Sequence, residues 1–115
     1  MDTKKEDAEQ FLKEFHDKMA TFEVIIRSER SENLQTMLDL ELTDFSVREH
    51  LKKLTVEDFY KGPTKDNSGG ADLWEFGKKI KNKEVYIKVT LGCLNKPVIC
   101  ISFHFPIRTI KYPFK

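Results

Sequence analysis

A predicted hairpin over residues 83–105 is the sequence feature that most constrains the fold. Apolar and polar residues alternate over 85–91 and again over 99–105. Alternation with a period of two is typical of strands that bury one face. The segment 94–97 between them reads Leu-Asn-Lys-Pro, and Asn and Pro favour tight turns. Such a hairpin needs another element to cover its apolar face.

The two faces of this hairpin differ in chemistry. We expect one face to carry the apolar side chains of Val85, Ile87, Val89, Leu91, Ile99, Ile101, Phe103 and Phe105. By the same alternation, the opposite face carries Tyr86, Lys88, Thr90, Cys100, Ser102 and His104. This polar face holds groups that donate and accept protons, so it is the candidate surface for a ligand.

Two amphipathic helices are predicted to pack on the apolar face. The helix near residues 4–20 has an apolar stripe at three- and four-residue steps, made of Ala8, Phe11, Leu12, Phe15, Met19 and Phe22. Thr3 and Glu6 have the spacing of a capping box at its start. The second helix is expected at 44–54, capped by Thr43 or Asp44.

The other segments give weaker patterns. Phe22–Arg27 is rich in β-branched residues and is a candidate strand. Residues 34–42 fit a helix and also a strand, and we favour the helix. A further helical turn is expected at 55–58, a turn and a polar loop at 60–70, and a strand at 73–80. Together these elements predict an α+β domain.

Composition limits the class of protein. The 115 residues, 39% of them hydrophobic, suit one domain with one core, which we place over 1–115 with a helical extension at 1–20 and a tail at 106–115. The charged start and the lack of a long apolar run predict a cytoplasmic protein with no membrane partner. Cys93 and Cys100 are expected as reduced thiols, with a disulfide as the less favoured alternative. No ligand spacing for a metal and no phosphate loop is seen, so no cofactor is expected.

Charge is distributed unevenly along the chain. Residues 1–55 hold 9 Lys/Arg and 13 Asp/Glu, a net charge of −4, whereas residues 56–115 hold 11 and 6, a net charge of +5. A basic half is consistent with an anionic partner, although an uneven solvated surface would have the same counts. The polar hairpin face belongs to the basic half.

Four short segments stand out as a set: Leu54–Lys61 (LTVEDFYK), Leu73–Glu75 (LWE), Glu84–Lys88 (EVYIK) and Ile101–His104 (ISFH). Together they resemble the MqsR-like toxins, the motility quorum-sensing regulator family of bacterial type II toxin–antitoxin systems. The resemblance covers roughly residues 20–105 and supports a helix at 34–42. It implies a RelE-like fold, endonuclease activity on single-stranded messenger RNA, and a cognate antitoxin as partner.

The resemblance also suggests individual residues. The family's F-Y-K motif matches Phe59-Tyr60-Lys61, and its strand tyrosine matches Tyr86. Two positions depart from the pattern: Glu75 stands where proteobacterial members have Gln, and His104 stands where they have Lys. These departures bear on substrate preference and on activity itself.

Metal-independent RNA cleavage requires three tasks of the protein. It must remove the proton of the 2′-OH, stabilise charge on phosphorus, and protonate the leaving 5′-oxygen. We predict His104 as the proton shuttle, because its ordinary pKa is about 6.5. Glu75 could act as a base, and Tyr86 as an acid or a stacking platform. Lys61 completes the predicted catalytic group.

Residues expected to bind RNA are Tyr60, Lys78 and Lys88. Each candidate also has an ordinary explanation. The lysines could serve only solubility, and Glu75 could form a surface ion pair that contributes little to stability. A histidine on a strand, such as His104, is more often a polar surface residue than a catalyst. The leading hypothesis is an mRNA endoribonuclease toxin. The alternative is a non-catalytic RNA- or protein-binding module that retains the toxin fold.

Overall fold

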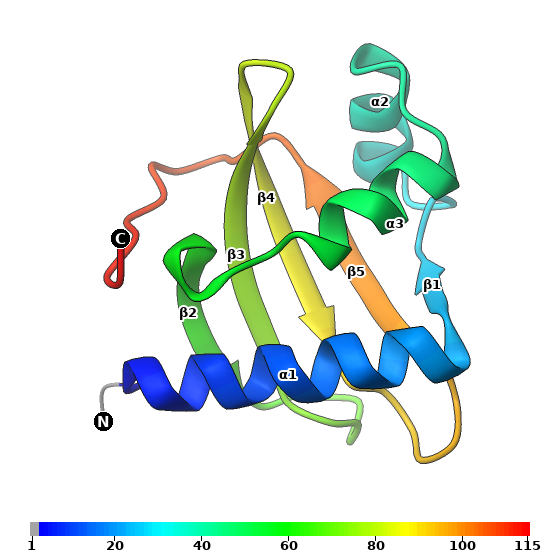
Figure 1. Cartoon of the computed structure of the whole chain (residues 1–115). Helices are drawn as coiled ribbons and strands as arrows, with labels where there is room; N and C mark the ends of the chain where they lie inside the picture. Colours follow the sequence, from blue (N-terminus) through cyan, green and yellow to red (C-terminus); the bar gives the residue numbers. More distant parts are fainter. Residues whose placement is uncertain (1–2) are drawn as a thin grey trace.

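The computed structural model describes residues 3–115, which form a five-stranded sheet and three α-helices (Figure 1). The elements in chain order are α1 (Lys5–Phe22), β1 (Val24–Ile26), α2 (Ser31–Asp39), α3 (Asp44–Lys52), the 3₁₀ turn η1 (Val56–Asp58), β2 (Phe59–Thr64), β3 (Leu73–Ile80), β4 (Lys83–Thr90) and β5 (Val98–His104). The sheet order is β1-β5-β4-β3-β2. All neighbouring strands are antiparallel except β1 and β5. The predicted α+β class and the mostly antiparallel sheet are confirmed.

The core lies between the sheet and the two helices α1 and α3, which cross the same face of the sheet (Figure 1). The buried stripe of α1 consists of Ala8, Phe11, Leu12, Phe15 and Met19, as predicted. From the sheet, Phe76, Val85, Ile87, Val89 and Phe103 are fully buried against it. We call the opposite side of the sheet the outer face.

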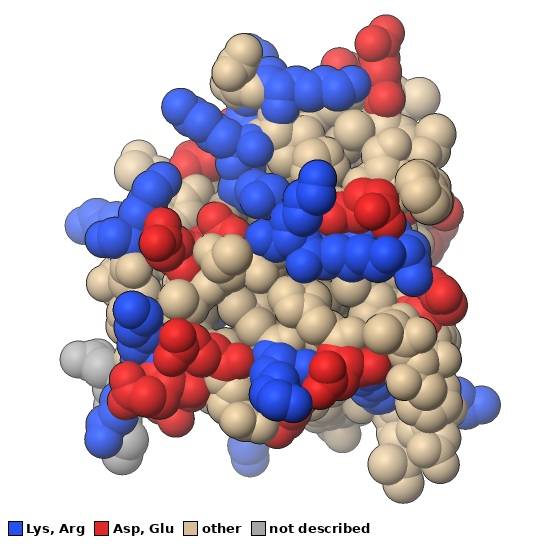
Figure 2. All heavy atoms as spheres, viewed as in Figure 1, with Lys and Arg blue, Asp and Glu red and all other residues tan. Residues whose placement is uncertain are grey.

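Charged side chains are mixed on the helix-covered side of the molecule. Figure 2 shows Lys and Arg across the upper and middle parts of this side, whereas Asp and Glu gather over the N-terminal half of α1 at the lower left. Part of the negative charge of residues 1–55 is therefore concentrated on α1. None of the helices within residues 3–115 combines the length and hydrophobicity that a bilayer-spanning segment requires.

Helix boundaries follow the predicted caps in one case and differ in another. Thr43 caps α3 as expected, because its Oγ1 accepts a hydrogen bond from the Ser46 backbone amide at 3.2 Å. The predicted capping box of Thr3 and Glu6 is wrong. Helix α1 begins one residue later, and Asp7 instead accepts from the Lys4 amide at 3.0 Å. The Thr3 hydroxyl donates to the Gly62 carbonyl, which ties the start of the chain to β2.

A β-bulge in β5 changes the predicted assignment of its faces. Lys88 pairs with Ser102 but Val89 pairs with Cys100, so Ile101 is an extra residue in the ladder. The bulge shifts the alternation by one residue. Cys100 therefore lies in the core rather than on the polar face, and Ile99, which pairs with Thr90, does not share the face of Phe103.

Strand β2 was not predicted as a strand. The expected turn at Gly62-Pro63 is wrong, because both residues lie within β2, joined by a cis peptide bond. This strand is at the edge of the sheet, where a proline without an amide hydrogen is tolerated. Helix α2 confirms a helix in the ambiguous segment but begins earlier than residue 34.

Candidate functional site

The outer face brings most of the predicted residues together by strand register. Glu75 on β3 pairs with Lys61 on β2 and with Lys88 on β4, and Lys88 pairs in turn with Ser102 on β5. These four positions form one row across the sheet. Alternation places the side chains of Glu75, Lys88 and Ser102 on the same face. Lys61 lies between two register shifts in β2, so its place in the row comes from its pairing with Glu75 and not from alternation. The row therefore places a carboxylate between two lysines.

The adjacent row contains the aromatic and imidazole groups. Tyr86 on β4 pairs with His104 on β5 and with Gly77 on β3. The rings of Tyr86 and His104 have centroids 5.2 Å apart and are tilted by 38°. We call Lys61, Glu75, Tyr86, Lys88 and His104 together the outer-face cluster. Its members come from four strands, so the sheet fixes their relative positions.

A hydrogen bond joins the two rows of the outer-face cluster. The hydroxyl of Tyr86 donates to Glu75 Oε1 at 2.5 Å. Glu75 is only 6% exposed, although it is a carboxylate. Burial of the phenol raises the pKa of Tyr86 well above its usual value, and the hydrogen bond to Glu75 raises it further. Tyr86 is therefore a protonated donor at neutral pH and not a base.

The surroundings of His104 favour one tautomer of its neutral ring. Nδ1 lies 3.0 Å from the carbonyl oxygen of Phe105, which can only accept a hydrogen bond. A proton on Nδ1 satisfies this contact and leaves Nε2 as an acceptor. Nε2 lies 3.9 Å from Oε2 of Glu32 on α2. When Nε2 takes up a proton, Glu32 is placed to stabilise the resulting charge.

The two lysines of the outer-face cluster have no salt bridge to any carboxylate in the described part of the chain. Lys61 is exposed and its Nζ lies 5.4 Å from the ring centroid of Tyr60. Lys88 is half-buried. Both ammonium groups are thus available to an anion, which is what a phosphate site requires.

Lys78 does not belong to this cluster, so its predicted place beside the other RNA-binding residues is wrong. It pairs with Val85, whose side chain is in the core, and therefore lies on the helix-covered side of the sheet. There it is near His50, whose pKa is lowered by burial first and then by the neighbouring lysines Lys78, Lys53 and Lys81. Lys78 is three residues after Glu75 on β3, an odd spacing, so alternation directs the two side chains to opposite faces of the sheet.

The C-terminal tail forms a wall beside the cluster. Ile110 is buried and Tyr112 is half-buried, and both lie against Gly77, where a Cβ atom would clash with them. The Tyr112 hydroxyl donates to Glu84 Oε2 at 2.7 Å. The tail therefore docks on the sheet. Tyr86 and His104, which lie in the same row as Gly77, are therefore bordered by the tail.

Glu32 and Asn33 contribute to the site without a signal in the sequence. Asn33 is 1% exposed and its amide donates to the carbonyls of Arg27 and Ile101 at 3.0 and 2.9 Å. Its Oδ1 accepts from the Phe103 amide at 2.9 Å. These bonds hold α2 against β5, and so they place Glu32 beside His104. A contact between residues some 70 positions apart cannot be predicted from local patterns.

No three His, Cys, Asp or Glu side chains of residues 3–115 gather so that they could hold a metal ion. Comparison with known proteins gives no match: no family model, no curated protein and no solved structure corresponds to the chain. The chemistry of the outer-face cluster is therefore the basis for a functional proposal.

Proposed function

We propose that the protein is the toxin of a toxin–antitoxin system and cleaves messenger RNA without a metal ion. The observation that carries this proposal is the outer-face cluster, in which His104 and the Tyr86–Glu75 pair lie beside two lysines that have no salt bridge. The four short segments that resemble MqsR-like toxins include each of these residues. A cognate antitoxin is part of the same proposal.

In the proposed reaction, His104 Nε2 accepts the proton of the 2′-OH, and the 2′-oxygen attacks phosphorus. The P–O5′ bond breaks, which leaves a 2′,3′-cyclic phosphate. The imidazolium then donates the same proton to the 5′-oxygen, so no proton is gained or lost. Glu32 stabilises the imidazolium, and Lys61 and Lys88 stabilise the charge on the phosphate.

The Tyr86–Glu75 pair has a supporting role in this scheme. Because Tyr86 remains protonated, its hydroxyl holds Glu75 Oε1 and fixes the orientation of the carboxylate. The orientation of the second carboxylate oxygen, Oε2, is thereby fixed as well. Oε2 is the alternative to His104 Nε2 as acceptor of the 2′-OH proton. Glu75→Gln removes this acceptor while it retains the shape of the side chain.

The experiment that tests the proposal is cleavage of RNA by the purified protein in EDTA, with mapping of the 5′ ends. His104→Ala should reduce the rate by about 10²–10⁴-fold, the usual contribution of a positioned acid or base. His104→Lys should restore part of the activity and move the pH optimum upward, since lysine has the higher pKa. Lys78→Ala, on the other side of the sheet, is the control and should cleave like the parent.

A non-catalytic binding module is the second candidate, and the low exposure of Glu75 favours it. Glu75 is 6% exposed and already accepts a hydrogen bond from Tyr86, which is also typical of a pair that stabilises the fold and has no catalytic role. The same experiment separates the two functions. If the parent binds RNA but leaves it uncut and does not slow growth, the binding module replaces the nuclease.

A further inference from the structure

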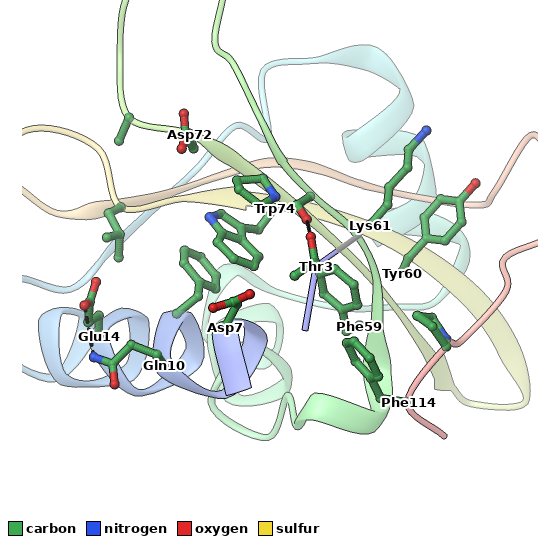
Figure 3. A pocket seen from close by; sticks show the side chains of 16 residues that line it. Thr3, Asp7, Gln10, Glu14, Phe59, Tyr60, Lys61, Asp72, Trp74 and Phe114 are labelled. Carbon is green, nitrogen blue, oxygen red and sulfur yellow. Dashed lines mark hydrogen bonds between the residues drawn. The ribbon is translucent and has the colours of Figure 1, made fainter. Parts of the chain in front are cut away.

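A hollow of the described surface extends beyond the outer-face cluster. It is a groove of about 1310 Å³ between the first half of α1, the strands β2 and β3, and the end of the tail (Figure 3). Of the predicted site residues, only Tyr60 and Lys61 border it. We call it the aromatic groove.

Aromatic side chains form the floor of this groove. Trp74 is half-buried and stacks on Phe11, with ring centroids 4.5 Å apart and an interplanar angle of 11°. Phe114 of the tail stacks on Phe59 at 5.2 Å and 21°. Trp74 also contacts Phe59 edge to face at 6.1 Å. These mutual contacts make the floor rigid, so a ligand finds an apolar surface that is already formed.

Carboxylates form the rim. Asp7 and Glu14 extend from α1 and Asp72 lies at the start of β3, so the rim is acidic on both sides of Trp74 (Figure 3). All three side chains are exposed. Among residues 3–115, Lys61 is the only cationic residue that borders the groove, and its side chain points away from Trp74 toward Tyr60. The groove is therefore negative as well as aromatic.

This combination selects among possible ligands. Aromatic surfaces bind nucleobases, but three carboxylates repel the phosphates that come with them. Arginine and lysine suit both parts of the groove, because their stems and the guanidinium plane pack on aromatic rings while their charge pairs with carboxylates. We propose that the aromatic groove binds a basic, arginine-containing peptide segment of a partner protein. This site meets the proposed RNA face only along β2, where Tyr60 and Lys61 border both.

Trp74 provides a direct test because it is the only tryptophan in the chain. The probe is the peptide acetyl-Ala-Arg-Leu-Arg-Ala-amide, which has no aromatic group. Its matched control has citrulline, the neutral analogue, in place of both arginines. We expect a saturable change of Trp74 fluorescence with the arginine peptide. Affinity for the citrulline peptide should be about tenfold lower, because hydrogen bonds to charged groups are lost.

Variants of the rim show whether the carboxylates are responsible. Glu14→Gln and Asp72→Asn should each weaken binding about two- to fivefold, the size expected for exposed charge pairs. Glu9→Gln makes the same charge change on α1 but does not border the groove, so it should bind like the parent. All of these positions are exposed, and the variants are expected to fold.

Three results would overturn the proposal. One is no saturable signal at millimolar peptide, and another is equal binding of the arginine and citrulline peptides. The third is displacement of the peptide by a hexauridine oligonucleotide, which would assign the groove to RNA. None of these measurements depends on RNA cleavage, so the peptide site and the nuclease stand or fall separately.

Discussion

The hydroxyl of Tyr86 on β4 donates a 2.5 Å hydrogen bond to Oε1 of Glu75 on β3, and the two residues lie in adjacent rows of the outer face. The bond places a nearly buried carboxylate beside a phenol that keeps its proton. It links the row that contains the two lysines to the row that contains His104. A ligand that contacts both the lysines and His104 on this face therefore lies beside the Tyr86–Glu75 pair.

This pair should make the protein sensitive to alkali. The pKa of Tyr86 is raised in the fold and is about 10 in the unfolded chain, so its contribution to stability is present below pH 10 and is lost as pH rises further. Urea unfolding between pH 8 and 11 should show a free energy of unfolding that falls above pH 10. Tyr86→Phe should reduce this slope but not remove it, because the pKa values of Tyr112 and Cys100 are raised as well. An unchanged slope in Tyr86→Phe would contradict the prediction.

RNA affinity should depend on salt through the lysines of the outer face only. Neutralised phosphates release counterions, so the slope of log K against log salt should fall by roughly 0.7 for each lysine removed from contact with a single strand. Lys61→Ala and Lys88→Ala should each show this in filter binding. Lys78→Ala carries the same charge change on the helix-covered side and should keep the parent slope. Equal effects of all three would indicate a diffuse charge effect and no defined phosphate site.

Asn33 should be important for stability because its buried side chain makes three hydrogen bonds, one of them buried and two part-buried. Asn33→Ala leaves the Phe103 amide and two carbonyls without these partners, and we expect a loss of about 2–4 kcal/mol in the free energy of unfolding. Gln35→Ala on the same helix removes only an exposed bond to Asp39 and should change stability by less than about 0.5 kcal/mol. Comparable losses in the two variants would show that Asn33 is not the link between α2 and β5.

Gly77 should control the docking of the tail. Gly77→Ala introduces a methyl group where Ile110 and Tyr112 now lie, so the tail has to move or the strand has to shift, at a cost of about 1–3 kcal/mol. Limited proteolysis should then cut after residue 106 faster than in the parent. Lys79→Ala, at an exposed position on the same strand, is the control. Unchanged protection of the tail in Gly77→Ala would contradict the contact.

The two cysteines should differ in reactivity. Cys93 is exposed, whereas Cys100 is fully buried and burial raises its pKa to about 12. The thiolate is the reactive form, so iodoacetamide at pH 8 should label Cys93 and leave Cys100 unmodified until the protein unfolds. Mass spectrometry of the native protein should find one label per chain, and Cys93→Ala should take up none. Labelling of Cys100 at a similar rate would show that the core opens there.

Local periodicity was sufficient to predict β4 and α3. Val85, Ile87 and Val89 are buried as their alternation indicated, and Val47 and Leu51 face the core at helical spacing. The hydrogen-bonding requirement at a helix start also limited the cap of α3 to Thr43 or Asp44, and the structure shows Thr43. These features depend on neighbours within one or two turns of the chain.

Features that depend on distant partners were not predictable in the same way. The bulge at Ile101 results from how β5 meets β4, and alternation alone gave Cys100 the wrong face. Gly62-Pro63 has the composition of a turn, but an edge position in the sheet makes it a strand. Within the candidate site, Tyr86 and His104 were placed together correctly, whereas Glu32 was missed because only the fold brings α2 beside β5.

Thr3 and Phe114 both border the aromatic groove, and the start of α1 and the C-terminal end of the chain lie on the same side of the molecule, at the left of Figure 1. The same sheet could therefore be formed by a chain whose strands follow one another in a different sequence order. A short linker could join the ends, and the exposed polar loop at 65–70 between β2 and β3 could be opened in exchange. Such a circular permutant would begin at β3 and end at β2, which would make one of the two edge strands the last element to be synthesised.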